Sequence, residues 1–302
     1  MTIRRMSTPL LQKDYRAVGH KLLERHLPTP LYRQCMRIVN GRGGRPDFFV
    51  LGTQKGGTTS LYHILAKLPG ILPAFRKEIE YFNDPDRRKF GVDWYLEHFP
   101  SSEIKQKLQV KLGFAPVTGE GTTLMNHPLA PGLLKEIAPD VKFVVLLREP
   151  SSRAYSHYQH NMQRGSETRS FEQALQEEDE AISRDLQELA KDINYPAHSI
   201  RAHSYKQRGR YVESLSRWLE HFPRENFYIE DSRTFFKEQD RILKEVQEFI
   251  GVPPVKVEQQ KRVYNKGSYS EKAPKKTIEQ LKEYFKPYNE SLWKLLGREF
   301  NW

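Results

Sequence analysis

Residues 47–60 read DFFVLGTQKGGTTS, and this stretch decides the fold class. The run 47–51 is apolar and of strand length, and it leads into a loop of small residues. The segment that follows carries four apolar residues at the spacing of one helical face: Leu61, Ile64, Leu65 and Leu68. A strand, a glycine-containing loop and a helix in this order are typical of the start of a parallel α/β unit.

A second strand is predicted at 142–147, where the sequence KFVVLL is almost continuously apolar. Such a run suits a strand that is buried on both faces of a parallel sheet. The segment REPSSRAYSHY follows, and its Pro150 suits the first turn of a helix. Helical patterns then alternate with a further strand at 226–230. We therefore predict one α/β domain whose central parallel sheet is flanked by helices.

The composition limits the class of protein. The chain has 302 residues, a net charge of +11 and one cysteine, Cys35, which excludes an internal disulfide framework and a cysteine-rich zinc site. No apolar run approaches the roughly 20 residues of a membrane helix, and the first residues lack the apolar core of a secretory signal. We expect a cytoplasmic protein without a membrane span, in which residues 1–46 form a basic helical extension and 47–302 the single domain.

Residues 52–60 form a predicted phosphate-binding loop. Backbone amides can surround an anion at the positive end of the following helix, and here they belong to Gly56, Gly57, Thr58 and Thr59. Lys55 adds a positive charge. The Walker A pattern G-x-x-x-x-G-K-[ST] is not met, because Thr58 stands where the lysine should follow the second glycine. A nucleotide kinase or ATPase that binds ATP with Mg²⁺ is therefore the less favoured alternative.

A second anion site is predicted at the end of the strand at 142–147. Arg148 ends this strand, and Ser156 lies eight residues further on in the following helix. Ligands bind at the carboxyl ends of strands in parallel sheets, so we expect Arg148 at the same edge as the phosphate loop. Arginine binds phosphate oxygens bidentately. Two separated phosphate sites and the absence of a Walker lysine argue against ATP as the ligand.

Seven motifs in order give the chain a family resemblance: TQKGGTTSLYHIL, KEIEYFND, GVDWYLEHFP, GEGTTL, LLREPSSRAYSHY, RGRYVESLSRWLEHFP and FKPYNESLWKLLGREFNW. From about residue 47 to 302 the chain resembles sulfotransferases that use 3′-phosphoadenosine 5′-phosphosulfate (PAPS). It is most similar to the branch that contains bacterial sulfotransferases and the sulfotransferase domains of heparan sulfate N- and 3-O-sulfotransferases. The resemblance implies a P-loop-like central parallel sheet of about five strands.

The resemblance also implies residue roles. Lys55 matches the lysine that contacts the 5′-phosphate and the leaving oxygen, Arg148 and Ser156 match the 3′-phosphate ligands, and Glu78 matches the catalytic base. Two further groups of residues match the family. The phosphate cradle is matched by Gly56, Gly57, Thr58, Thr59 and Ser60. A late loop that closes on the 3′-phosphate is matched by Lys266 and Gly267. The residues alone leave Glu78 and Glu80 open as the base, since both would face the same side of an extended segment.

The reaction implied is in-line displacement at sulfur, by analogy with phosphoryl transfer. The sulfuryl group of PAPS would pass to a hydroxyl, or less favourably an amine, of a saccharide or small-molecule acceptor, without a metal and with adenosine 3′,5′-bisphosphate as product. We expect a bacterial enzyme with no nucleic acid partner. A non-catalytic polyanion-binding protein is the second alternative, and it predicts steep salt dependence. Five side chains are candidates for contact with an acidic acceptor: Arg87, Arg88, His127, His160 and Arg201.

Overall fold

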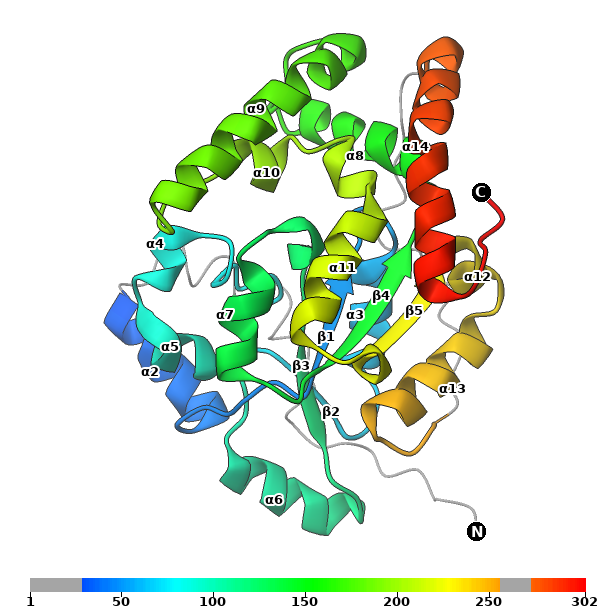
Figure 1. Cartoon of the computed structure of the whole chain (residues 1–302). Helices are drawn as coiled ribbons and strands as arrows, with labels where there is room; N and C mark the ends of the chain where they lie inside the picture. Colours follow the sequence, from blue (N-terminus) through cyan, green and yellow to red (C-terminus); the bar gives the residue numbers. More distant parts are fainter. Residues whose placement is uncertain (1–28, 256–272) are drawn as a thin grey trace.

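The computed structural model describes residues 29–255 and 273–302, which form a parallel sheet of five strands with helices on both faces (Figure 1). The strand order is β2-β3-β1-β4-β5. The predicted α/β class with a parallel sheet of five strands is confirmed, although the last strand begins one residue later than expected. The bounds are β1 Phe48–Gly52, β2 Ile71–Pro73, β3 Val117–Gly121, β4 Lys142–Leu147 and β5 Phe227–Asp231.

The helices surround the sheet as Figure 1 shows. In the described ranges no helix is both long and apolar enough to cross a membrane. The helix bounds are α2 Thr29–Asn40, α3 Thr58–Leu65, α4 Pro85–Arg88, α5 Gly91–Leu96, α6 Ser102–Leu112, α7 Ala130–Ile137, α8 Pro150–Gln163, α9 Phe171–Lys191, α10 His198–Ala202, α11 Tyr211–His221, α12 Ser232–Lys237, α13 Gln239–Ile250 and α14 Lys275–Leu296.

The central strands are apolar on both faces because each face meets a layer of helices. On β1, Phe48 and Val50 join the buried cluster formed with α3 and α13. Phe49 and Leu51 point to the other face and join the cluster formed with α7 and α11. Successive side chains of a strand alternate between faces, so a strand in this position needs an uninterrupted apolar run. This requirement explains the sequences of β1 and β4.

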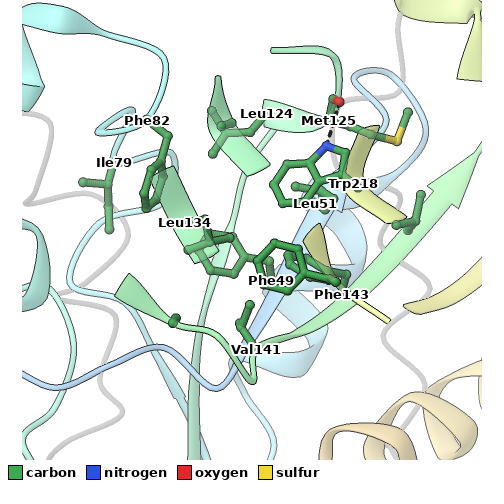
Figure 2. Close-up of a cluster of buried hydrophobic side chains, with 14 of the residues drawn as sticks. Phe49, Leu51, Ile79, Phe82, Leu124, Met125, Leu134, Val141, Phe143 and Trp218 are labelled. Atoms are coloured by element: carbon green, nitrogen blue, oxygen red, sulfur yellow. Dashed lines mark hydrogen bonds between the residues drawn. The ribbon is translucent and has the colours of Figure 1, made fainter. Parts of the chain in front are cut away.

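Aromatic rings fill the core between β4 and α11 (Figure 2). The ring centroid of Phe143 lies 4.7 Å from that of Phe227, 4.8 Å from Phe222 and 5.0 Å from Trp218. The indole Nε1 of Trp218 donates to the carbonyl oxygen of Met125 at 2.9 Å, which satisfies its one polar group. This packing fixes α11 against the sheet.

Helix α2 belongs to the segment predicted as an extension. Its Tyr32 and Met36 are buried in the same cluster as β1. Its Arg33 and Arg37 both bind the buried carboxylate of Glu97, each with an N–O distance of 2.7 Å. Residues 1–28 lie outside the described part of the chain, so a domain boundary at residue 46 stays a prediction.

Helices α9 and α10 lie beyond the carboxyl ends of the strands (Figure 1). Ser170 caps α9 through a reciprocal hydrogen-bond pair with Gln173. The buried carboxylate of Glu178 accepts hydrogen bonds from the backbone amides of Lys206 and Gln207, both at 2.7 Å. The charged segment at 170–191 is therefore tied to the chain that leads into α11.

We expect Phe143→Ala to lower the free energy of unfolding by about 3–5 kcal/mol, because it leaves a cavity among three aromatic rings. Urea denaturation followed by circular dichroism measures this change. Val110→Ala on α6 is the control, since that side chain is 87% exposed and its loss should change stability by less than about 0.5 kcal/mol. A loss below about 1 kcal/mol for Phe143→Ala would contradict the packing described.

Candidate active site

The loop between β1 and α3 is held close to the end of β4. The Thr53 amide donates to the Leu146 carbonyl at 2.8 Å, and the Gly56 amide donates to the Thr53 carbonyl at 2.9 Å. A Cβ atom at position 56 would lie 2.6 Å from the Leu146 carbonyl oxygen. Gly57 precedes α3 with a φ of 98°, which favours glycine. Both glycines are therefore required by the course of the loop.

Helix α3 offers its amino terminus to an anion. No side chain caps its first turn, and the first amides of a helix have no partner within the helix. Such a terminus attracts anions through its free amides and the helix dipole. The five predicted cradle residues lie in this loop and first turn: Gly56, Gly57, Thr58, Thr59 and Ser60.

Arg148 lies against the phosphate loop, as expected for the edge where β1 and β4 end. Its Nη1 atom donates to the carbonyl oxygen of Lys55 at 3.1 Å. Its own carbonyl oxygen accepts a hydrogen bond from the Tyr211 hydroxyl at 2.7 Å. The two predicted phosphate anchors are thus in direct contact, and α11 holds one of them in place.

The Lys55 ammonium group lies among other cations. Burial lowers its pKa, and the positive charges of Arg148 and Arg164 lower it further. An anion placed between these groups would favour the charged form of the lysine. The local charge therefore fits a phosphate or sulfate group, which gives physical support to the cradle.

The other predicted 3′-phosphate ligands are Ser156, Lys266 and Gly267. Ser156 lies on α8 and is 1% exposed. Lys266 and Gly267 lie outside the described residues. The roles assigned to these three residues stay predictions.

The expectation of an extended segment around Glu78 and Glu80 is wrong. Both residues have left-handed backbone, with φ values of 58° and 64°. The Glu78 carboxylate is 43% exposed and lies 2.5 Å from the Lys77 ammonium group. Burial raises the pKa of Glu80, whereas the charges of Arg201 and Arg76 lower it. The two carboxylates therefore have different surroundings.

His160 on α8 is influenced by charges of both the phosphate loop and the Glu78 carboxylate. Burial and the charges of Lys55 and Arg164 lower its pKa to about 4, and the charge of Glu78 opposes this shift. A neutral imidazole therefore lies close to both the proposed cation and the proposed base. Within the described residues, no group of three His, Cys, Asp or Glu side chains is placed to hold a metal ion.

Two of the candidates for contact with the acceptor have partners within the chain, and a third, His127, is buried. His127 is buried, and burial together with the charges of nearby arginines lowers its pKa to about 3. Arg201 pairs with Asp84 at 2.8 Å. Arg88 donates to the Ile193 carbonyl oxygen. The two arginine contacts join α10 and the residues after α9 to α4, a role that the local sequence does not predict.

Two further residues near the site had no predicted role. Tyr211 holds Arg148, and Glu120 is fully buried at the end of β3. Both lie in quoted motifs, RGRYVESL and GEGTTL. A polar residue within a motif at the carboxyl end of a strand, or at the start of the following helix, is a signal that could have identified them.

A family profile described as a sulfotransferase domain matches residues 45–291. The chain belongs to this family. The predicted resemblance and the predicted enzyme class are thereby confirmed, and sulfotransferases of this family in general take the sulfuryl group from PAPS.

Named relatives agree with the family. The human bifunctional heparan sulfate N-deacetylase/N-sulfotransferase 3 is 31% identical over 219 residues, which are 69% of this chain but only 22% of that protein. The mouse heparan sulfate glucosamine 3-O-sulfotransferase 5 is 25% identical over 278 residues, 85% of this chain and 74% of the relative. The sulfotransferase from Alicyclobacillus acidocaldarius has the same fold, with a TM-score of 0.62 and 24% identity over 85% of this chain and 98% of its own.

We expect Tyr211→Phe to weaken the binding of adenosine 3′,5′-bisphosphate by the sulfotransferase about threefold to tenfold, because it frees the backbone of Arg148 by removing one hydrogen bond of about 1 kcal/mol. Isothermal titration calorimetry measures this affinity. Tyr228→Phe is the matched control, since its hydroxyl also donates at 2.7 Å, to Glu245, but near the amino end of β5. Equal losses of affinity in the two variants would count against a positioning role for Tyr211.

Proposed function

We propose that this sulfotransferase transfers the sulfuryl group of PAPS to a hydroxyl group of a saccharide. The observation that carries the proposal is the contact of the Arg148 guanidinium with the backbone of Lys55. It links two cationic groups that suit two phosphates of one nucleotide. Relatives named as heparan sulfate N- and 3-O-sulfotransferases support a saccharide acceptor. The N relative is the more identical, at 31% against 25%, whereas the 3-O relative matches 85% of the chain against 69%; the proposal of a hydroxyl follows the longer match.

Two sets of residues are assigned to the donor. Lys55, the backbone amides of Gly57, Thr58 and Thr59, and the rest of the loop from Gly56 to Ser60 would bind the 5′ side, because a helix terminus and a lysine both favour anions there. Arg148 and Ser156 would bind the 3′-phosphate, with Lys266 and Gly267 as the pair that closes on it. Bound PAPS supplies the sulfuryl group and a phosphate leaving group.

Glu78 is the proposed base. Its half-exposed carboxylate can be reached by a substrate hydroxyl, and His160 senses the charges of both Glu78 and Lys55. Burial raises the pKa of Glu80, and its charged neighbours include Arg201 and Arg76. A base must lie within hydrogen-bond reach of the proton that it removes, so the half-exposed carboxylate of Glu78 is favoured.

The residues would act together as follows. Glu78 accepts the acceptor proton as the acceptor oxygen attacks sulfur. Lys55 and the loop amides stabilise the negative charge that develops on the leaving side. Most of the rate gain would come from holding the reacting groups in line, since orientation alone can remove several kcal/mol from the barrier.

We expect adenosine 3′,5′-bisphosphate to bind in the absence of metal, and Arg148→Ala to weaken this binding about tenfold to a hundredfold, because a charge-assisted hydrogen-bond donor is lost. Titration calorimetry with this nucleotide and with ATP and Mg²⁺ is the measurement. Arg241→Ala on α13 is the control, since that side chain pairs with Glu238 and Glu245 on the protein surface. Binding of ATP with Mg²⁺ alone would favour the kinase or ATPase alternative instead.

We expect Glu78→Gln to lower sulfuryl transfer at least a hundredfold, because the acceptor proton loses its base. Glu80→Gln should lower it less than tenfold. Mass spectrometry of desulfated, N-acetylated heparin oligosaccharides incubated with PAPS measures the transfer, and nucleotide affinity should be unchanged in both variants. A greater loss for Glu80→Gln would reassign the base. Binding of the oligosaccharide with no transfer by the wild type would favour the polyanion-binding alternative.

A further inference from the structure

Glu120 is a fully buried carboxyl group at the carboxyl end of β3. Its neighbours Gly119 and Gly121 face the other side of the strand, where a Cβ atom would lie 2.6 Å from the Phe48 ring and 2.7 Å from the Tyr62 ring, respectively. Because side chains alternate along a strand, this register turns the Glu120 side chain away from α3. The GEG sequence therefore directs one carboxyl group toward the segment that carries Glu78.

The end of β3 binds two consecutive amides of that segment. The Glu78 amide donates to the Gly121 carbonyl at 3.1 Å. The Ile79 amide donates to Oε1 of Glu120 at 2.9 Å. The other carboxyl oxygen, Oε2, lies 3.3 Å from the Tyr95 hydroxyl on α5. Glu120 thus connects β3, α5 and the segment around the proposed base.

The backbone from Glu78 to Glu80 needs contacts from other elements to keep its conformation. Glu78 and Glu80 both have left-handed backbone, which is unfavourable for residues other than glycine. Ile79 between them is completely buried. Backbone of this kind persists only where surrounding contacts determine it, and the Glu120 carboxyl is the side chain that binds the amide between the two left-handed residues.

The buried Glu120 carboxyl is more stable in its neutral form than as a carboxylate. Burial raises the pKa of Glu120 to about 8, the Ile79 amide and the Tyr95 hydroxyl oppose the shift, the charge of Glu78 adds to it, and Lys77 opposes it. Among the described residues, the groups that act on the charge of Glu120 are the Ile79 amide and Tyr95 by hydrogen bonds and Glu78 and Lys77 by their charges. Below pH 8 a neutral Glu120 avoids a second negative charge beside the proposed base.

We propose that Glu120 is a positioning residue, whose buried carboxyl fixes the Ile79 amide and thereby holds Glu78 where its carboxylate can meet the acceptor. The inference rests on the proposed role of Glu78 as the base. It adds a residue that touches neither donor nor acceptor but determines the backbone from which the base projects.

The experiment compares Glu120→Gln with Glu120→Leu in the full chain. Glutamine keeps an oxygen for the Ile79 amide and an amide group for Tyr95, whereas leucine offers neither at similar volume. Two readouts are used: hydrogen exchange of the Ile79 amide without ligand, and the slow hydrolysis of PAPS, in which water replaces the unidentified acceptor. Glu178→Leu is the matched control, because Glu178 is also buried and also binds two backbone amides, those of Lys206 and Gln207.

We expect Glu120→Leu to speed exchange of the Ile79 amide at least tenfold and to lower PAPS hydrolysis at least tenfold, with the affinity for adenosine 3′,5′-bisphosphate changed less than threefold. Glu120→Gln should restore both properties to within threefold of the wild type. The wild-type rate of PAPS hydrolysis should fall as the pH rises through about 8, because the ionised Glu120 is unfavourable in its buried position and the segment around Glu78 then loosens. The rate of Glu120→Gln should not fall in this range, because glutamine stays neutral. Glu178→Leu should leave exchange at Ile79 unchanged.

Unchanged exchange at Ile79 in Glu120→Leu would overturn the proposal, whatever the activity. Faster exchange with unchanged hydrolysis would also overturn it, provided that Glu78→Gln abolishes hydrolysis. If Glu78→Gln itself keeps full hydrolysis, the proposed base is wrong, and the failure belongs to the function and not to the Glu120 contact. If Glu120→Leu does not fold, the wild type and Glu120→Gln decide: identical pH profiles of hydrolysis would overturn the proposal.

Discussion

The hydrogen bond from the Arg148 guanidinium to the Lys55 carbonyl oxygen joins the two halves of the site. It can form because β1 and β4 are parallel neighbours, so both end at the same edge of the sheet. The residues around it fix the arginine backbone from two sides. Tyr211 binds the Arg148 carbonyl, and the side chain of Glu149 caps α8 by accepting from the amides of the first turn. The loop that carries Lys55 and the start of α8 are thereby held together at one edge of the sheet.

The parts of the site that local patterns encode could be predicted from the sequence. The apolar runs of β1 and β4, the loop between 52 and 58 and the arginine after β4 each have a signal within a few residues. Strand β3 was missed as a strand, because VTGEG contains two glycines and one apolar residue. Its glycines are required by contacts with Phe48 and Tyr62, which lie far away in the sequence.

The conformation around the base depends on contacts that no local pattern contains. The left-handed backbone at Glu78 and Glu80 is held from the end of β3, about 40 residues later, through the hydrogen bond between Ile79 and Glu120, a sequence separation of 41. The assumption of an extended segment at Glu78 and Glu80 failed for this reason. Burial of His127 was equally invisible, because a histidine near arginines has the same local sequence whether it lies on the surface or in the core. Long-range packing thus decides which polar side chains can meet a ligand.

The ion pair between Arg201 and Asp84, together with the bond from Arg88 to the Ile193 carbonyl, joins the α9–α10 excursion to the short helix that follows the base segment. Sequence changes in α9 and α10 therefore affect the segment that carries Glu78, and cannot accumulate independently of it. A chimera that received α9 and α10 from another member of the family would have to import residues 84–88 with them, or lose the alignment of both.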